Sequence, residues 1–187
     1  ISKNATTGAI TVISGNKMAT EASSGAGIEG TAEVYVTQVE RFKSDTDTNV
    51  NLVKTTILLD LTGLASSGAN DIIGKAGTGV AYIGRVTAVN QGTVFGVTME
   101  CLETPAGGDP DIDLYSATEA TGVEDSAIGD LTETQIINSG DLAAGTRVAG
   151  GTIVADQYLY LVAGSATNAD YTAGRIIITI TGYDVAS

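Results

Sequence analysis

The chain has 187 residues, enough for one domain with a core of its own, and 43% of them are hydrophobic. Nine basic against 22 acidic residues leave a formal net charge of −13, and such a field repels phosphate backbones, which argues against nucleic acid as a partner. No apolar run approaches the roughly 20 residues that span a bilayer, so the sequence predicts no membrane partner either.

Residue types that commonly carry catalysis are scarce. The sequence has no histidine and one cysteine, Cys101, so it lacks His-based nucleophile pairs, an internal disulfide and cysteine-rich metal cages. Carboxylates are so numerous that no single acid–base pair stands out. We therefore predict no catalytic residues and a non-enzymatic protein, with Cys101 as a buried or half-buried apolar side chain.

The first 31 residues are rich in Gly, Ala, Ser and Thr, which is typical of a segment that does not fold by itself. They hold one apolar patch, Ile10-Thr11-Val12-Ile13. We predict that residues 1–31 form an extended N-terminal arm, held by the domain's own surface or by a neighbouring subunit. Ile10, Val12 and Ile13 are its predicted assembly contacts.

Two glycine-rich stretches imitate nucleotide-binding motifs. Gly25, Gly27 and Gly30 fit G-x-G-x-x-G, but a predicted strand follows them where a dinucleotide site needs a helix. The stretch from Gly74 to Gly79 lacks the Gly-Lys-Ser/Thr ending of a phosphate loop. We interpret both as turns and predict no nucleotide cofactor.

From Ala32 onward, alternation with a period of two and many β-branched residues predict strands. Val80–Asn90 and Thr93–Glu103, separated by the turn-prone pair Gln91-Gly92, predict a central hairpin. Near Thr134–Asn138 the sequence is consistent with a continuous ordered excursion or with one or two short strands. Further strands are predicted at Ala32–Phe42, Asn51–Leu61, Arg147–Ala155, Gln157–Ala163 and Arg175–Val185. In the last of these, Ile176, Ile178 and Ile180 share one face.

The two prolines, Pro105 and Pro110, are expected to end the central hairpin, because proline cannot donate to a strand ladder. A polar, acidic excursion follows at about 116–146, with at most one short helix near Asp130–Ile137. Eleven of the 22 acidic residues lie between Arg85 and Arg147, where no basic residue occurs. This stretch predicts a negative surface that faces water, a cation or a basic partner.

Eight to ten short strands without a helical apolar stripe indicate an all-β protein. We predict a two-sheet antiparallel sandwich, jelly-roll-like, with an extended N-terminal arm. Residues 32–187 would form this single β-sandwich domain.

Two clusters are candidate sites. Asp109, Asp111 and Asp113 supply the oxygen ligands that Ca²⁺ prefers, and the alternative is that these carboxylates are solvated or hydrogen-bonded within the chain. No other metal or cofactor is predicted. Tyr158 and Tyr160 share a strand face, as stacking groups for a glycan or as a packing pair at the edge of the core.

Two stretches resemble virion structural proteins of tailed bacteriophages, many of them marine: CLETPAGGDPDIDLYSATEATGVEDSA (Cys101 to Ala127) and YLYLVAGSATNADYTAGRIIITITGYD (Tyr158 to Asp184). The similarity covers roughly Leu58 to Asp184. It implies a structural β-sandwich protein on the capsid exterior, a decoration (cement) protein or a head knob, with no functional residues to carry over. The implied partners are the major capsid protein and further copies of this chain, commonly as a homotrimer. The alternative is an adhesin-like head knob that binds host-surface glycans.

Overall fold

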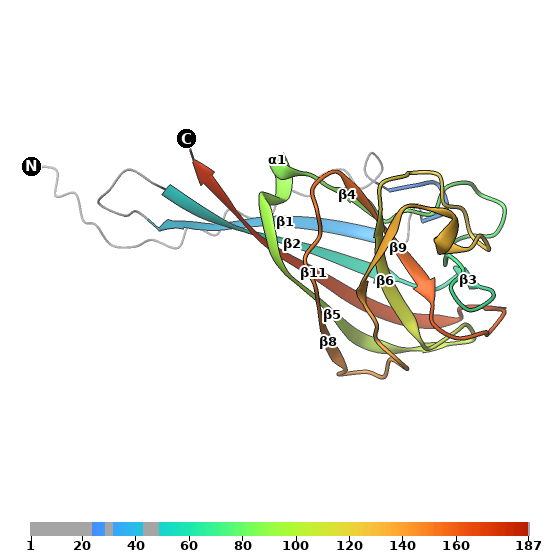
Figure 1. Cartoon of the computed structure of the whole chain (residues 1–187). Helices are drawn as coiled ribbons and strands as arrows, with labels where there is room; N and C mark the ends of the chain where they lie inside the picture. Colours follow the sequence, from blue (N-terminus) through green and yellow to red (C-terminus); the bar gives the residue numbers. More distant parts are fainter. Residues whose placement is uncertain (1–23, 29–31, 43–48, 187) are drawn as a thin grey trace, which may run out of the picture.

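The computed structural model describes residues 24–28, 32–42 and 49–186. Strands dominate these ranges and helical turns are short (Figure 1). In chain order the elements are β1 (Ala32–Phe42), β2 (Asn49–Asp60), β3 (Ala65–Ser66), β4 (Gly84–Val86), α1 (Ala88–Gln91), β5 (Thr93–Ala106), β6 (Ile112–Ala117), η2 (Ile128–Asp130), β7 (Glu133–Ile137), β8 (Arg147–Gly150), β9 (Gln157–Ala163), β10 (Ala169–Asp170) and β11 (Ala173–Ala186).

The strands form two antiparallel sheets with a wrapped topology. A five-stranded sheet has the order β1-β2-β11-β5-β8, a four-stranded sheet has the order β4-β9-β6-β7, and β10 pairs with β3. Four strand pairs are nested in the sequence, each enclosing the next, and successive pairs alternate between the two sheets: β2–β11, β4–β9, β5–β8 and β6–β7. This nesting is the jelly-roll arrangement, with β1 added at one edge. The predicted fold class, an all-β antiparallel sandwich, is confirmed.

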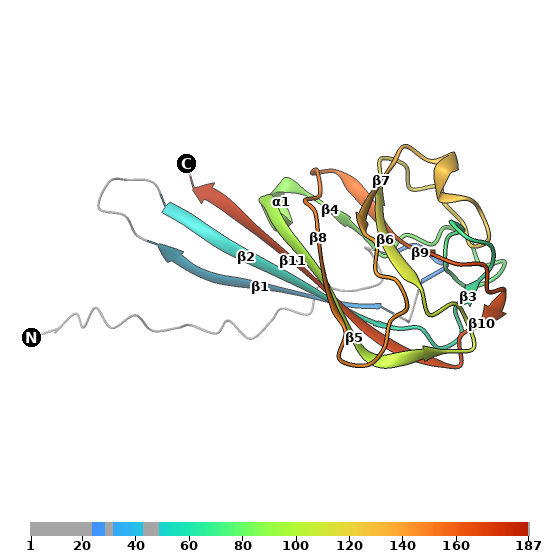
Figure 2. The same ribbon diagram turned by 60° about the horizontal axis from the view of Figure 1, so that its bottom comes forward.

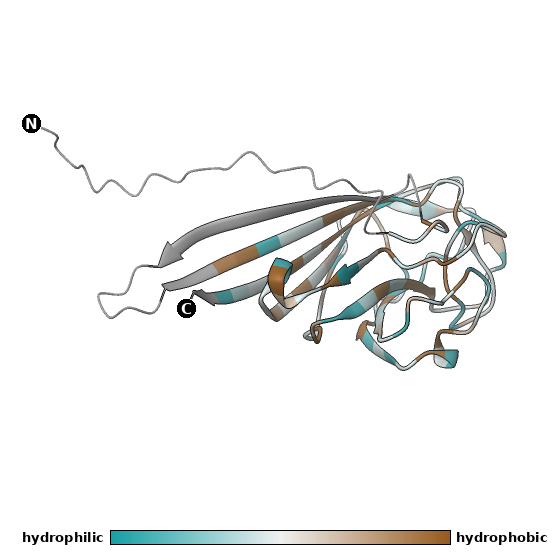
Figure 3. Cartoon of the chain, turned by 90° about the horizontal axis from the view of Figure 1, so that it is seen from above, coloured by the Kyte–Doolittle hydropathy of each residue, from teal (hydrophilic) through white to brown (hydrophobic). Residues whose placement is uncertain are grey.

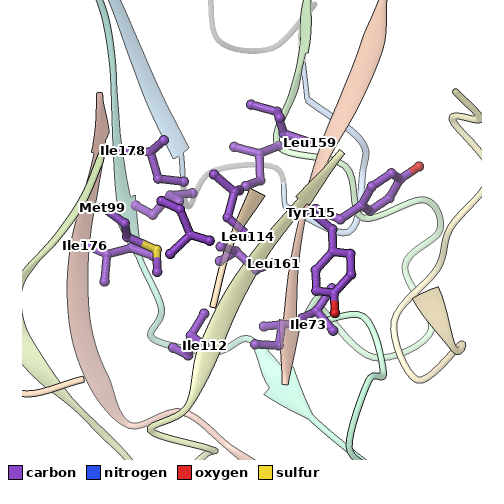
Figure 4. Close-up of a cluster of buried hydrophobic side chains, with 14 of the residues drawn as sticks. Ile73, Met99, Ile112, Leu114, Tyr115, Leu159, Leu161, Ile176 and Ile178 are labelled. Atoms are coloured by element: carbon purple, nitrogen blue, oxygen red, sulfur yellow. The ribbon is translucent and has the colours of Figure 1, made fainter. Parts of the chain in front are cut away.

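The main core lies between the two sheets (Figure 4). Strand β11 turns Ile176, Ile178 and Ile180 inward, while Ile177 on the opposite face is only partly buried. The predicted alternation of this strand is therefore confirmed. Leu114 and Leu161 of the four-stranded sheet are fully buried in the same core.

The two inner strands of the four-stranded sheet, β6 and β9, are buried on both faces. All six residues of β6 are buried, as are the last five of β9. Beyond this sheet lies the loop that contains Gly122, where a Cβ atom would collide with the Tyr160 ring. A strand covered on both faces needs apolar residues at successive positions, which explains why Gln157–Ala163 alternates so poorly.

The predicted central hairpin is wrong. Of Val80–Asn90, only Gly84–Val86 is a strand, and it pairs with β9, whereas β5 pairs with β11 and β8. Between them Thr87 caps the single helical turn α1, accepting a hydrogen bond from the Asn90 backbone amide. Gly92 then leaves with φ of 62°, and the chain crosses from one sheet to the other.

The segment after β5 also differs from the prediction. Pro105 does not end the strand: β5 continues to Ala106, because the proline falls where the pairing with β11 shifts register. The inner strand β6, Ile112–Ala117, includes Ser116 and Ala117, the first two residues of the excursion predicted at about 116–146. The one short helix allowed near Asp130–Ile137 corresponds to the 3-10 turn η2, which ends at Asp130, and the strand considered near Thr134–Asn138 is β7.

A short strap, Gly25–Ile28, connects the start of the described chain to the domain. The amides of Gly25 and Gly27 donate to the carbonyls of Tyr82 and Val80, both at 2.8 Å, and Ile28 is buried in the hydrophobic core. A Cβ atom at Gly25 would collide with the Val80 carbonyl. This part of the G-x-G-x-x-G pattern therefore serves close backbone packing, and it belongs to the domain although it lies inside the predicted arm.

Three strands project beyond the rest of the sandwich. The ends of β1, β2 and β11 extend past the first residue of β5, which pairs with Tyr183 (Figures 1 and 2). Beyond that point β2 and β11 still pair with each other through Asn49↔Ala186. The molecule thus has a broad end covered by loops and a narrow end formed by this three-stranded extension.

Candidate interaction surface

The Asp109 side chain is an internal structural anchor. It is fully buried, and its carboxylate accepts hydrogen bonds from the backbone amide and hydroxyl of Ser165 at 2.8 and 2.7 Å and from the Asp111 amide at 3.0 Å. Its own amide donates to the Ser66 hydroxyl, and its carbonyl accepts from the Tyr171 hydroxyl. Asp109 therefore joins three loops and has its charge satisfied within the chain.

Asp113 is bound in a similar way, and Asp111 is not. The Asp113 carboxylate accepts from the Gln135 side-chain amide at 2.8 Å and from the Ser139 amide at 2.9 Å. Asp111 presents a buried oxygen, Oδ1, that has no hydrogen-bond partner among the described residues. Burial raises the pKa of Asp111, and the charges of Asp113, Asp109 and Asp141 raise it further.

These carboxylates do not converge on a shared ligand position. Across residues 24–28, 32–42 and 49–186, no group of three or more Asp, Glu, Cys or His side chains is arranged to hold a metal ion. The geometry of Asp109 and Asp113 matches the hydrogen-bonded alternative considered for this cluster. Calcium binding by the three residues stays a prediction without geometric support.

The two tyrosines of β9 have different environments. Tyr160 is fully buried, and its hydroxyl donates to the Glu119 carbonyl at 2.8 Å. Burial raises its pKa to about 12. Tyr158 is partly exposed, packs edge-on against the Tyr82 ring and lies under the Arg85 guanidinium, 5.4 Å from the ring centroid. Of the proposed stacking pair, only Tyr158 can meet a ligand from solvent.

Nucleophilic chemistry finds little support in the described part of the chain. Cys101 is buried, as expected, and burial raises the pKa of its thiol. A thiol with a raised pKa is a poor nucleophile at neutral pH. Within the same ranges, no helix has the length and apolar character needed to cross a membrane.

Exposed apolar side chains gather instead at the narrow end. In the described part of the chain, the two most exposed large hydrophobic residues are Val89, 94% exposed, and Val154, 69% exposed. Val89 lies on α1 and Val154 in the loop before β9, and these two segments lie side by side in Figures 1 and 2. Phe95, 52% exposed, lies on the other side of the five-stranded sheet from α1, with its ring 6.3 Å from that of Tyr183. We call Val89 and Val154 the apical patch.

The apical patch adjoins the three-stranded extension. Helical turn α1 packs against β2 and β11, and Figure 3 shows its hydrophobic colour beside the projecting strands. Clustered exposed apolar residues mark interaction surfaces more often than scattered ones do. The patch therefore is the best candidate for a functional surface in the described chain.

Sequence reasoning missed the apical patch, and it named contacts that the structure does not describe. Val89 was assigned to a strand, where its side chain would alternate into or out of a sheet, and only the helical turn exposes it. The pair Gln91-Gly92 was a usable signal, because it indicates a break in the strand. Ile10, Val12 and Ile13, the predicted assembly contacts, lie outside the described residues.

Comparison with known proteins gives no further assignment. No protein family matches the sequence, and no curated protein or solved structure is significantly similar to the chain.

Proposed function

We propose that this chain is a non-enzymatic structural protein of a bacteriophage virion, which decorates or cements the capsid shell from outside. The observation that carries this proposal is the apical patch, where Val89 and Val154 are exposed beside three projecting strands. An attachment surface needs apolar area that is free in the isolated protein and buried in the assembly.

Two further features support the proposal. Jelly-roll domains occur widely in viral capsids and in lectins, which is an argument from fold analogy. The sequence stretches Cys101 to Ala127 and Tyr158 to Asp184 resemble phage virion proteins. In such an assembly the partners are the major capsid protein and further copies of this chain, as a homotrimer, on the exterior of the capsid. Many copies bound at once need no single tight contact.

The test is binding of the full-length protein to shells of its phage that lack it. We expect Val89→Asp combined with Val154→Asp to reduce the bound fraction at least tenfold, because a charge buried in an apolar contact is costly. Cosedimentation with the shells measures occupancy, and the melting temperature shows that the fold is intact.

A control is Val123→Asp, which adds one negative charge at an exposed valine in the loop that pairs with Val80; each single variant, Val89→Asp and Val154→Asp, is compared with it directly. Binding by the double variant at the level of the control would refute attachment through the apical patch. Absence of binding by the unaltered chain would refute the decoration role itself.

An alternative function is glycan binding by a head knob, and the environment of Tyr158 favours it. The ring is partly exposed beside Tyr82, and the ion pair between Arg85 and Asp156, at 3.0 Å, supplies polar groups next to it. A sugar ring could stack on such an aromatic group while its hydroxyls bind the ion pair. A glycan array in which the unaltered chain and Tyr158→Ala bind equally, or not at all, would exclude this role.

A further inference from the structure

The loop between β7 and β8 docks beside the start of β6 through its segment Ser139–Leu142, which we call the docking segment. At one end the Ser139 amide donates to the Asp113 carboxylate at 2.9 Å. At the other end the Leu142 amide donates to the Pro110 carbonyl at 2.9 Å, and the Leu142 side chain is buried in the core. The docking segment is therefore fastened at both ends.

Two carboxylates face each other between these fastenings. Asp111 and Asp141 pair in an isolated antiparallel bridge. Because the Leu142 amide donates to the carbonyl of the residue before Asp111, this is a pair of the non-hydrogen-bonded type, in which facing residues lie closest. Like charges directly opposite each other destabilise such a pair. The docking segment is therefore held in place against a repulsion between carboxylates.

The Asp111 carboxyl occupies space that is open only because residue 164 is a glycine. The Gly164 amide donates to the Asp111 carbonyl at 2.7 Å, and a Cβ atom on Gly164 would collide with the Asp111 carboxyl. In this position Oδ1 of Asp111 is buried and has no hydrogen-bond partner among the described residues. Burial of a carboxyl oxygen without a donor favours the protonated form.

The charges that act on Asp111 favour the same form. Burial is the largest cause that raises its pKa, followed by the charges of Asp113 on β6, Asp109 in the loop before β6 and Asp141 in the docking segment. The loop after β9 faces Asp111 with the uncharged backbone of Gly164. Undocking of the segment would remove the Asp141 charge and admit water to the carboxyl, whereas Asp109 and Asp113 would stay in place.

We propose that Asp111 is a proton-dependent latch, and that the docking segment binds more tightly when Asp111 is protonated than when it is ionised. The sign follows from linkage, because the docked form holds the proton more strongly than the open form. Docking is tightest below pH 3.8, the ordinary pKa of the side chain. It weakens as the pH rises through the raised pKa of docked Asp111. This device goes beyond the proposed function and does not depend on it.

Release of the docking segment would uncover an apolar side chain. Leu142 is 2% exposed when the segment is docked. The pH would therefore control how often Leu142 and the carbonyl of Pro110 are available to solvent or to another molecule.

Amide hydrogen exchange of the full-length chain tests the latch. The Leu142 amide reports undocking, and the Gly151 amide, which donates to the Ile136 carbonyl at 3.0 Å, reports openings elsewhere between β7 and β8. Protection factors are corrected for the intrinsic exchange rate at each pH. We expect the ratio of the Leu142 factor to the Gly151 factor to be at least threefold higher at pH 4.0 than at pH 7.5. A ratio that does not change with pH would overturn the inference.

Three variants separate the latch from a general effect of charge. Asp111→Asn, which cannot ionise, should abolish the pH dependence of the ratio. Asp141→Asn should reduce it only in part, because Asp141 raises the pKa of Asp111 less than burial, Asp113 and Asp109 do. Asp130→Asn removes an exposed carboxylate on η2 and should leave the pH dependence unchanged.

Two results with these variants would contradict the latch. One is an Asp111→Asn chain that keeps the pH dependence of the unaltered chain. The other is an Asp141→Asn chain that keeps it in full, since the docking segment would then not act on Asp111 through its charge. Asp141 is exposed, so this second variant remains informative if Asp111→Asn does not fold.

Discussion

At the scale of single residues, Asp111 is a site where the fold tolerates an unfavourable charge. Its Oδ1 is buried without a partner among the described residues, and Asp109, Asp113 and Asp141 raise its pKa after burial itself. The neighbouring backbone holds this side chain in its position. The Asp111 carbonyl accepts from the Gly164 amide at 2.7 Å, and a Cβ atom at Gly164 would collide with the Asp111 carboxyl.

This arrangement predicts that Asp111→Asn stabilises the protein at neutral pH. A raised pKa means that the folded chain keeps a proton that the unfolded chain, with a pKa near 3.8, has released. The stabilising contribution of the protonated Asp111 side chain is therefore complete below pH 3.8. It is lost as the pH rises through the folded-state pKa. Urea unfolding from pH 3.5 to 7.5 should show a difference between the variant and the unaltered chain that grows across this window.

A control for this effect is Asp130→Asn, which removes an exposed carboxylate on η2. It should change the free energy of unfolding little at any pH. The contrary outcome is a difference in unfolding free energy between Asp111→Asn and the unaltered chain that is no larger at pH 7 than at pH 3.5. The Asp111 carboxylate would then not destabilise the folded protein.

Gly92 is the second residue on which the local fold depends. Its φ is 62°, and a Cβ atom there would collide with the Tyr183 carbonyl oxygen. We expect Gly92→Ala to lower the free energy of unfolding by about 2–3 kcal/mol. Gly96, the fourth residue of β5, has open space where a Cβ atom would lie. Gly96→Ala should therefore change the free energy of unfolding by less than about 0.5 kcal/mol. Denaturant unfolding of the two variants compares them directly.

At the scale of elements, the five-stranded and four-stranded sheets differ in how buried and exposed residues alternate along their strands. Strand β11 has one face toward the core and one toward the outer face, and its residues alternate accordingly. Strands β6 and β9 are covered on both sides and show no alternation. The difference arises because two loops, one with Tyr82 and one with Gly122, form a third layer over the four-stranded sheet, where the Ala81 amide donates to the Gly122 carbonyl.

A pair of neighbouring isoleucines measures this asymmetry. Ile178→Ala should cost about 2–5 kcal/mol of unfolding free energy, because Ile178 is fully buried between the sheets. Ile177→Ala removes the same atoms from the partly exposed face and should cost roughly 1 kcal/mol. Equal losses in thermal or chemical unfolding would mean that the outer face is packed as tightly as the core.

At the scale of the whole molecule, the strap Gly25–Ile28 decides where the domain begins. Its amides bind Tyr82 and Val80, and Ile28 fills part of the core. A truncation that removes residues 1–31 therefore removes core atoms as well as the arm. A truncation at residue 23 leaves these contacts in place.

We predict that the chain lacking residues 1–23 unfolds with the same free energy as the full chain. The chain lacking residues 1–31 should lose at least about 2 kcal/mol, the transfer energy of the buried isoleucine. Differential scanning calorimetry of both truncations checks this. A chain lacking 1–31 that is as stable as the full chain would show that the strap is not part of the folded unit.

Much of the fold was predictable from the sequence, because strand periodicity is a local property. Ala32–Phe42, Gln157–Ala163 and the alternation of Ile176, Ile178 and Ile180 follow from side-chain types alone. The wrapped strand order was predictable only as a fold class, the jelly-roll type, and the individual strand pairs were not. The burial of Cys101 was predicted from residue type, which is also a local argument.

The errors share one cause, which is that pairing and covering are set by distant parts of the chain. Val80–Asn90 and Thr93–Glu103 are adjacent in sequence, yet their strands belong to opposite sheets because β9 and β11 supply their partners. Ile112–Ala117 contains a charged residue, and only Gln135 and Ser139 make Asp113 acceptable in a buried strand.

The sequence by itself determined the all-β class, the acidic surface and the scarcity of catalytic residue types, since composition and a period of two express these directly. Tertiary structure alone decided that Asp109 and Asp113 are hydrogen-bonded anchors, that Tyr160 is buried, and that Val89 and Val154 are exposed in neighbouring segments. The physical reason is that exposure and hydrogen-bond partners depend on segments tens of residues away, and no local pattern records them.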